Sequence, residues 1–297
     1  MDRRTFCISA LLFFVFAFSV RSQEIVAHDL LVSISPEKRH IQVEDTLSLK
    51  GKGPYVFLLN GNLALTALQA PFVLKSSEII GDVQQYGINA YFPDISSRIA
   101  LRRYEIVLPP EIQVPEENRV KIAYQGEIHY PIEQVGTEHV RSFQETPGII
   151  SKEGVYLSGS SFWYPVQPRT MVRSRIDVRV PNGWMALSQG KNLDSRTEGD
   201  FRHTTWDNPW LTDEIYLVAG PWIEYQKKSG AVSCLVYLRK KEDALAGRYL
   251  EATAQYIAMY SRLIGEYPYT QFALVENFWE TGYRSEEHTS ELQSPNT

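Results

Sequence analysis

Histidine is the side chain that points most directly to metal chemistry, and this 297-residue chain contains six. Two imidazoles bind a metal from one helix face when they stand four residues apart. Five histidines precede residue 284, and none has a second one at that spacing: His28, His40, His129, His139 and His203. We therefore predict that these five lie on the surface or on strand faces, and that they include no zinc ligand.

A serine-rich segment suggests a second kind of chemistry. Its sequence is Gly154-Val-Tyr-Leu-Ser-Gly-Ser-Ser-Phe-Trp-Tyr-Pro165, which places Ser158 between Tyr156 and an aromatic cluster. A nucleophilic serine at a strand-to-helix elbow requires the pattern G-x-S-x-G, which this segment lacks, and no adjacent histidine and acid accompany it. The pattern therefore disfavours serine catalysis, and an aromatic turn that packs two sheets together is at least an equal alternative.

Glu276, Asn277 and Glu280 form the third candidate, and they follow the apolar run Phe272-Ala-Leu-Val275. A carboxylate at the rim of a cleft can bind the ammonium group of a peptide, and the backbone of a strand edge can pair with an extended peptide. In the alternative, Asn277 caps a turn and Glu280 is a solvated surface residue.

The tryptophans suggest a platform on which sugar rings stack, as in a carbohydrate-binding module. There are six of them: Trp163, Trp184, Trp206, Trp210, Trp222 and Trp279. In β-sandwiches such side chains more often fill the core, because each buries a large apolar area. The segment Trp206-Asp-Asn-Pro-Trp210 is predicted to form a turn, and it is the best candidate for an exposed platform.

One long helix must position the acidic segment, and the sequence predicts it from Glu242 to Gly265. Its apolar and aromatic residues recur at three- and four-residue steps, along one side of a helix of period 3.6: Leu245, Tyr249, Tyr256, Tyr260, Leu263 and Ile264. Gly265 tolerates a positive φ, and Pro268 follows where a helix cannot continue. The apolar run from Phe272 then predicts a strand.

The chain before this helix, from Ile25 to about Arg239, has the pattern of β-structure. Short alternating or β-branched segments such as Arg175-Ile-Asp-Val-Arg-Val180 are separated by turn signals such as Asn60-Gly-Asn62 and Pro181-Asn-Gly183. Short strands at this spacing predict a mainly β fold with an amino-terminal antiparallel β-sandwich or saddle-shaped pair of sheets.

The first 22 residues predict a secretory signal peptide. Arg3 and Arg4 precede an apolar run from Phe6 to Val20, which is shorter than the ~20 residues that a membrane helix needs. Cleavage before Gln23 would export the chain to the bacterial periplasm or the medium, with no stable membrane insertion afterwards. An uncleaved amino-terminal anchor is the alternative.

Composition limits the partners and the sources of stability. The net formal charge of −5 provides no basic stripe to neutralise phosphates, so no nucleic acid partner is expected. Cys7 lies in the predicted signal peptide and Cys234 has no second cysteine to pair with, so stability must come from core burial. The 43% hydrophobic composition allows such a core in one or two domains, and the oligomeric state stays open.

The order of these segments resembles the aminopeptidase-N-like zinc metallopeptidases, a family of gluzincins. The resemblance rests on Tyr267-Pro-Tyr269 after the helix, on the run Asn277-Phe-Trp-Glu-Thr-Gly-Tyr283, and on Gly220-Pro-Trp-Ile-Glu224. His28-Asp-Leu-Leu-Val-Ser-Ile-Ser-Pro-Glu-Lys38 is similar to the family's first strand and turn. The resemblance implies a β-domain followed by the first helix and strand of a truncated thermolysin-like α/β catalytic domain.

The same resemblance assigns roles to the candidate residues. The family's edge segment, usually Gly-Ala-Met-Glu-Asn, is replaced here by a Trp-Glu-Thr-Gly-Tyr run, as in a bacterial branch of the family. Glu280, Asn277 and Glu276 would occupy the rim that binds the ammonium group of a peptide substrate, with Glu280 slightly favoured because it lies closer to the aligned loop. Tyr156 and Ser158 would lie on the loop that lines the first specificity pocket.

The zinc motif H-E-x-x-H of that family is absent, so the zinc of the parent protein would have its ligands outside this chain. Residues from Arg284 onward have no apolar period and are similar to a translated sequencing adapter, with a polar natural tail as the alternative. We therefore expect a signal peptide at 1–22, a β-sandwich domain at 23–240, the start of a catalytic domain at 241–283 and a non-native tail at 284–297.

Two functions follow as expectations. In the first, the chain is the amino-terminal part of an exported zinc-dependent metallopeptidase, whose parent is an aminopeptidase-like hydrolase, and the fragment itself is inactive. In the second, it is a secreted, non-catalytic β-sandwich module that binds carbohydrate or protein and whose fold ends near Arg239. Uncovered apolar surface on the long helix would favour the first.

Overall fold

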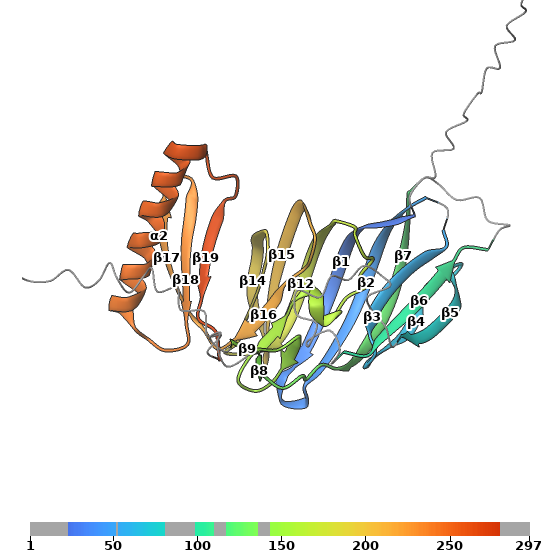
Figure 1. The fold of residues 1–297 in the computed structure, drawn as a ribbon. Helices are drawn as coiled ribbons and strands as arrows, with labels where there is room; N and C mark the ends of the chain where they lie inside the picture. Colours follow the sequence, from blue (N-terminus) through green and yellow to red (C-terminus); the bar gives the residue numbers. More distant parts are fainter. Residues whose placement is uncertain (1–22, 52, 81–98, 110–116, 136–142, 280–297) are drawn as a thin grey trace, which may run out of the picture.

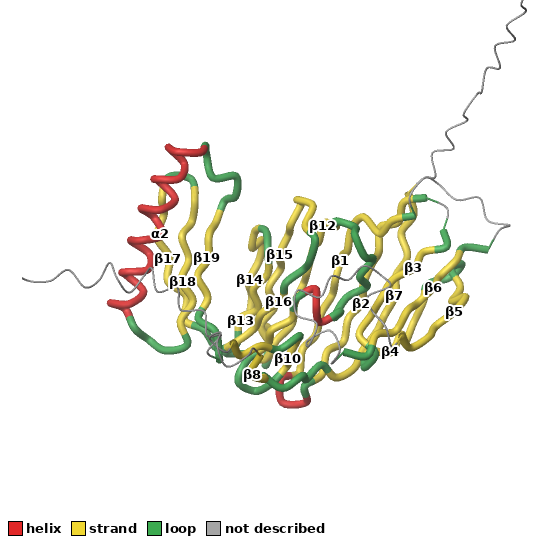
Figure 2. Tube along the Cα trace, viewed as in Figure 1, coloured by secondary structure: helices red, strands yellow, loops and turns green. Residues whose placement is uncertain are grey.

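The computed structural model describes residues 23–51, 53–80, 99–109, 117–135 and 143–279. Figure 1 shows two parts, which we call the β-domain (β1 to β16) and the α/β unit (β17, β18, α2 and β19). The fold is mainly β, as the sequence predicts. Figure 2 shows the single α-helix of the described residues on the side of the α/β unit that faces away from the β-domain.

A seven-stranded sheet spans the β-domain. In spatial order its strands are β14 (Lys191–Glu198), β15 (Phe201–Thr212), β12 (Val172–Pro181), β1 (Glu24–Ser35), β2 (His40–Lys50), β7 (Glu117–Glu127) and β4 (Leu63–Leu68). Neighbouring strands in this sheet are antiparallel except β1 and β12, which pair in parallel with Asp29 opposite Arg175. The predicted antiparallel pairing therefore holds for every pair of the sheet but this one.

Alternation of apolar and polar residues gives this sheet one buried and one exposed face. In β2 every second side chain from Ile41 to Leu49 is buried, and β12 repeats the pattern from Val172 to Val180. The turn between β1 and β2 is the 3-10 helix η1 (Pro36–Lys38), which is followed by Arg39 in a left-handed backbone conformation. The period of two thus sets which side chains reach the core.

Two smaller sheets pack against the buried face of the large one. The first consists of β3 (Tyr55–Asn60), β6 (Leu101–Val107) and β5 (Val73–Ile80), and the second of β10 (Gly148–Ile150), β11 (Val155–Leu157), β16 (Leu217–Gly220) and β13 (Met185–Ser188); β8 (Glu133–Val135) and β9 (Phe143–Glu145) form a separate pair. The shared core includes Leu47, Phe57, Leu157 and Trp163. The predicted sandwich is therefore confirmed.

The predicted turn around Trp206 and Trp210 is wrong. Both residues lie in β15, where Trp206 is buried and Trp210 is 56% exposed. Asn-Pro is a strong turn signal, but Pro209 falls in a bulge, between the pairs Ser174–Asn208 and Val172–Thr212. A proline is tolerated there because the bulge requires no ladder hydrogen bond from it.

The α/β unit is a three-stranded sheet with one helix packed on it. β17 (Ile223–Ser229) and β18 (Val232–Leu238) form a hairpin, and β19 (Gln271–Val275) pairs in parallel with β18. α2 (Asp243–Ile264) makes the crossover that a parallel pair requires. The helix ends before Gly265, whose φ of 118° suits glycine. The predicted helix and strand are both confirmed.

The apolar side of α2 is wider than the sheet beneath it. Ala246, Leu250 and Ile257 pack against the apolar residues of β18. A neighbouring stripe of the same helix is between 44% and 83% exposed: Tyr249, Tyr256, Tyr260, Leu263 and Ile264. At ~100° per residue this stripe lies directly beside the packed positions, so the sheet covers only part of one continuous apolar side.

Residues 1–22 and 284–297 lie outside the described residues, so the signal peptide and the non-native tail stay predictions. The predicted domain boundary between residues 240 and 241 also stays a prediction. It falls within the α/β unit, between β18 and α2. Among the described residues, no helix combines the length and the apolar character needed to cross a membrane.

Candidate functional site

A cavity of about 480 Å³, which we call the cleft, lies between the β-domain and the α/β unit. Its lining is mainly apolar and aromatic. Tyr156 and Tyr216 line it from the β-domain, and Ala273, Val275 and Asn277 line it from the α/β unit. A concave apolar site with a few polar groups at its edge is the usual form of a binding site for a small ligand or a side chain.

Strand alternation turns two sheet faces toward each other across the cleft. In β11, Leu157 belongs to the core of the β-domain, whereas Tyr156 beside it lines the cleft. In β19, Ala273 and Val275 line the cleft, whereas Leu274 between them packs against the cluster under α2. The cleft therefore forms where the outer face of the four-stranded sheet meets the inner face of the three-stranded one.

A buried cluster joins the two parts beside the cleft. Leu187, Trp206, Trp222 and Tyr237 pack together, with the first two from the β-domain and Tyr237 from β18. The indole of Trp206 donates to the carbonyl oxygen of Ala186 at 3.0 Å. Large aromatic side chains bury a large apolar area and stabilise a junction when their polar atom keeps a hydrogen bond. The junction between the two parts is therefore a packed core.

Residues 276–279, which we call the strap, return from β19 to the β-domain. Trp279 donates from Nε1 to the carbonyl oxygen of Gln144 in β9 at 3.0 Å, and its ring centroid is 5.2 Å from that of Tyr156. Gly154 leaves room for Phe278, because a Cβ at this position would lie 2.3 Å from the ring atom Cδ1. The strap thus ties the α/β unit to β9, β11 and the turn before it.

The strap contains two of the three residues predicted to bind a peptide's ammonium group. Glu276 and Asn277 both line the cleft, and Glu280 lies outside the described residues. Asn277 Oδ1 accepts the backbone N–H of Phe278 at 2.9 Å, which agrees with the alternative that Asn277 caps a turn. The Glu276 carboxylate accepts the backbone N–H of Arg239 at 2.5 Å. The ammonium-binding role stays a prediction for all three.

Of Tyr156 and Ser158, only Tyr156 lines the cleft. Burial raises the pKa of its hydroxyl; the Glu214 carboxylate adds to this shift, while a hydrogen bond with Ser158 opposes it. Ser158 is buried and does not line the cleft. Its Oγ is 2.7 Å from that of Ser160, and it directly precedes η3 (Gly159–Ser161). The substrate contacts expected of both residues stay predictions.

Sequence reasoning missed Glu214, whose carboxylate contacts Tyr216, a residue that lines the cleft. One of its oxygens accepts the Gly159 N–H at 2.9 Å, and the other forms a short hydrogen bond with the Tyr216 hydroxyl. Burial raises the pKa of Tyr216 well above its usual value, and the bond to Glu214 raises it further. No local motif marks Glu214, because Gly159 becomes its neighbour only when β11 pairs with β16.

The part of the chain that the structure describes has no group of three or more His, Cys, Asp or Glu side chains that could hold a metal ion. Its residues therefore do not fit the zinc that the resemblance implies. His28 lies in the core with Nδ1 2.7 Å from Asp45 Oδ2, and His129 Nδ1 is 3.1 Å from the carbonyl oxygen of Ile150. His139 lies outside the described residues.

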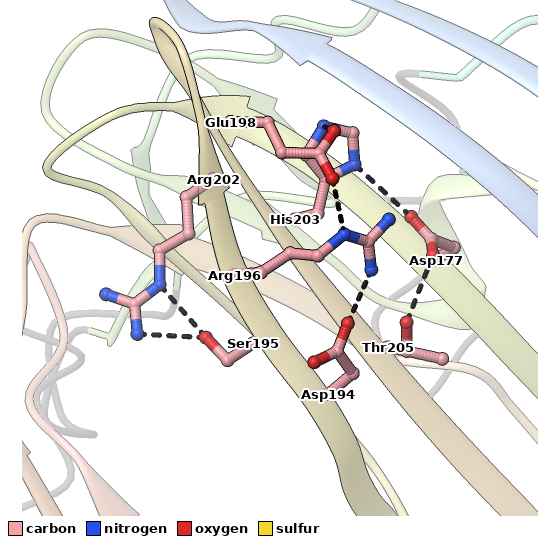
Figure 3. A network of polar contacts seen from close by, with 8 residues as sticks. All are labelled: Asp177, Asp194, Ser195, Arg196, Glu198, Arg202, His203 and Thr205. Carbon is pink, nitrogen blue, oxygen red and sulfur yellow. Dashed lines mark hydrogen bonds and ion pairs between the residues drawn. The ribbon is translucent and has the colours of Figure 1, made fainter.

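A polar network surrounds His203 on the exposed face of the large sheet (Figure 3). Its Nδ1 is 3.6 Å from Asp177 and its Nε2 is 3.8 Å from Glu198, while Arg196 joins Glu198 to Asp194. His203 thus makes cross-strand contacts to β12 and β14, while the two contacts of Arg196 lie within β14. The network borders a groove of about 600 Å³ that shares no lining residue with the cleft, so it is a separate feature.

No protein-family model and no curated protein match this chain. Its fold does match solved structures. The M1 zinc metallopeptidase from Deinococcus radiodurans aligns with a TM-score of 0.54 and 15% identity, over 86% of this chain and 56% of the other. A variant of the Deinococcus radiodurans enzyme bound to a Tyr-Ser-Ala substrate aligns with a TM-score of 0.52 and 13% identity, over 86% and 56%.

A two-domain M1 zinc metallopeptidase variant bound to L-tryptophan also aligns, with a TM-score of 0.54 and 14% identity, over 86% of this chain and 57% of the other. At such low identity the likeness establishes the fold alone. The chain therefore has an M1-like fold, with the mainly β architecture of the amino-terminal domain of these metallopeptidases, and it spans little more than half the length of the matched chains.

Proposed function

We propose that this chain is the amino-terminal portion of an exported zinc-dependent metallopeptidase, whose parent protein hydrolyses peptide bonds as an aminopeptidase does. The observation that carries the proposal is the extent of the likeness, which covers 86% of this chain but only 56% of the matched M1 zinc metallopeptidase. Export is inferred from the basic and apolar residues at the amino terminus.

The uncovered side of α2 supports the same proposal. In a complete domain an amphipathic helix buries its apolar side, whereas Tyr256, Tyr260 and Leu263 of α2 are exposed. Phe272 and Val275 of β19 are also partly exposed, at 36% and 39%. Large exposed apolar patches mark surfaces that another element covers. We infer that further elements of the parent's catalytic domain cover the exposed apolar residues of α2 and β19.

This observation also weighs against the binding-module alternative. A self-contained module that ends near Arg239 would have no use for a helix with an apolar side wider than its sheet. The best exposed platform for a sugar would be Trp210 in β15, because Trp206 of the same strand is buried. The observations therefore favour the metallopeptidase proposal.

The cleft is the part of this chain that would meet the peptide. Tyr156, Tyr216 and Phe278 make its lining aromatic, and its volume of about 480 Å³ leaves room for a large apolar or aromatic side chain together with its neighbouring groups. The matched structures include complexes with Tyr-Ser-Ala, with L-tryptophan and with L-arginine, so the ligands are not all aromatic. From the aromatic lining of the cleft we propose that the parent prefers peptides with an aromatic residue beside the scissile bond.

Zinc belongs to the parent protein in this proposal. The described residues offer no group that could bind it, so its ligands would come from elsewhere in the parent. The contribution of this chain would be the wall of the cleft and the strap, which bind and orient the peptide. The purified chain is therefore expected to be inert as a protease.

Two measurements on the purified 297-residue chain, its zinc content and its hydrolysis of substrates, test whether it is inactive. Mass spectrometry of the metal content should find only trace zinc, and aminoacyl coumarin amides of Phe, Tyr and Leu should stay intact. Stoichiometric zinc, or hydrolysis that a chelator abolishes, would refute this part of the proposal.

The reading frame beyond Tyr283 tests the parent. We expect H-E-x-x-H within roughly a hundred residues, followed at some distance by a further glutamate on a helix, because this arrangement supplies zinc ligands and a general base. The longer protein should then cleave the same aminoacyl amides, the aromatic ones fastest. If the continuation contains no such helix, the enzyme proposal fails and the binding module replaces it.

A further inference from the structure

Each polar group of Glu276 is engaged in holding the strap. Its backbone N–H donates to the carbonyl oxygen of Tyr237 at 2.9 Å, and its carbonyl oxygen accepts the indole N–H of Trp222 at 3.0 Å. Its carboxylate accepts the backbone N–H of Arg239 at 2.5 Å. Tyr237 lies at the end of β18, Arg239 follows that strand, and Trp222 precedes β17. Glu276 therefore connects the strap to the segment before β17 and to the end of β18.

The same contacts continue into the β-domain through Arg239. Its guanidinium donates from Nη1 to the carbonyl oxygen of Glu153 at 2.8 Å. The next residue is Gly154, whose missing side chain leaves the space that the Phe278 ring occupies. Phe278 stands two residues after Glu276. The contacts therefore close a circuit from Glu276 through Arg239 and the 153–154 turn back to the strap.

We propose that Glu276 is a positioning residue, whose hydrogen bonds hold the strap at the end of β18 and, through Arg239, against the β-domain, and so fix one wall of the cleft. The Glu276 carboxylate accepts a hydrogen bond from a main-chain N–H, whose position is fixed by the backbone. A neutral oxygen at the same place could accept this hydrogen bond too, so the negative charge is not required. The claim that Glu276 shapes a substrate site rests on the proposed function. The claim that its hydrogen bonds hold the strap in place, which we call the lock, does not.

These contacts make Glu276 a weaker candidate for binding a peptide's ammonium group. A carboxylate that is already committed to Arg239 N is poorly placed to change partners, because releasing it would leave that N–H without its acceptor. The same argument applies to Asn277 Oδ1, which accepts the backbone N–H of Phe278, so Glu280 is the remaining candidate of this segment for the ammonium group.

Hydrogen exchange of the whole chain, read by mass spectrometry, tests the lock. Glu276→Ala should raise the exchange rate of peptides that cover residues 276–279 by roughly tenfold, and Glu276→Gln should stay within about threefold of the wild type, because its amide oxygen still accepts. Peptides from β1 and β2 should exchange as in the wild type. Glu266→Ala is the matched control, since Glu266 is an exposed acid on the loop before β19.

Two results overturn the proposal: a strap that stays as protected in Glu276→Ala as in the wild type, or a Glu276→Gln variant that exchanges as fast as Glu276→Ala. If Glu276→Ala does not fold, Gly154→Ala decides, because it displaces Phe278 at the other end of the circuit. Gly154→Ala should release the same peptides, and normal protection there would refute the circuit.

Activity of the parent separates failure of the lock from failure of the proposed function. In the parent, Glu276→Ala should raise KM for aromatic aminoacyl amides several-fold more than it lowers kcat, and Glu276→Gln should restore KM. If the parent hydrolyses none of these amides, the proposed function fails while the exchange experiment still decides the lock. An unchanged KM in Glu276→Ala would overturn the role in shaping the cleft.

Discussion

Nδ1 of His28 lies 2.7 Å from Oδ2 of Asp45 inside the core of the β-domain, and neither side chain has any exposed surface. The two residues come from β1 and β2, where Asp45 stands opposite Leu30 and His28 stands opposite Leu47. Removing a histidine and a carboxylate from water costs free energy unless they keep each other as partners. The fold should therefore be unusually sensitive to the loss of either one.

Replacing Asp45 tests this sensitivity. Asp45→Ala should lower the free energy of unfolding by about 3–5 kcal/mol, because it leaves buried His28 without a partner and opens a small cavity. Asp45→Asn should cost less, because an amide oxygen can still accept from the imidazole. Urea unfolding followed by circular dichroism measures both.

Asp29→Ala is the matched control for this experiment. Asp29 is on the exposed face of β1, where its carboxylate lies 3.4 Å from Arg119, and such a pair contributes at most ~1 kcal/mol. If Asp45→Ala lost no more stability than Asp29→Ala, the buried pair would not have the importance that its geometry indicates.

The pair also predicts a pH dependence. Burial raises the pKa of Asp45 above its usual 3.8, while the charge of His28 and its hydrogen bond oppose the shift. A raised pKa means that the folded state holds the proton more tightly than the unfolded state. The contribution of Asp45 to stability is then fully present below the unfolded pKa and is lost as the pH rises through the folded pKa.

The comparison of wild type with Asp45→Asn measures this dependence, because the amide does not titrate. The free energy of unfolding of the wild type, relative to Asp45→Asn, should fall as the pH rises from about 3 to 7. A difference that stays constant, or that rises over this interval, would contradict the direction of the shift. The charge of Asp29 also raises the pKa of Asp45, so the comparison is best repeated on an Asp29→Asn background.

Local patterns were sufficient to predict several single elements of the fold. The helix α2 has apolar residues at helical spacing and a glycine and proline at its end, and these signals depend only on neighbours in the sequence. The same holds for β19 and for the alternating strand β12. The bulge at Pro209 shows the limit, because pairing with β12 overrides a strong local turn signal.

The cleft could not be predicted as a cavity, because it depends on contacts between distant segments. Tyr156 and Asn277 were candidates from the sequence, but only the return of the strap onto β11 brings them to one cavity. Glu214 was missed for the same reason. His28 and Asp45 meet because of the register of β1 and β2, which no residue type near either of them specifies.

The uncovered side of α2 predicts opposite outcomes for two leucines of one helix. Leu263 is 69% exposed, so Leu263→Glu should change the free energy of unfolding by less than about 0.5 kcal/mol and should reduce binding of a dye that reports apolar surface. Leu250 is buried against β18, so Leu250→Ala should cost about 2–5 kcal/mol. If Leu263→Glu were as destabilising as Leu250→Ala, or left dye binding unchanged, the stripe would already be covered in this chain.

Gly247 gives a prediction of the opposite sign. It lies near the start of α2, on the exposed side, and nothing stands within 4 Å of the place where a Cβ would be. Glycine inside a helix loses more backbone freedom on folding than alanine, so Gly247→Ala should raise the free energy of unfolding by about 0.5–1 kcal/mol. Ala252→Gly, at an exposed position of the same helix, should lower it by a similar amount. Urea unfolding followed at the helix signal measures both, and a loss in Gly247→Ala would mean that α2 packs on that side against something in solution.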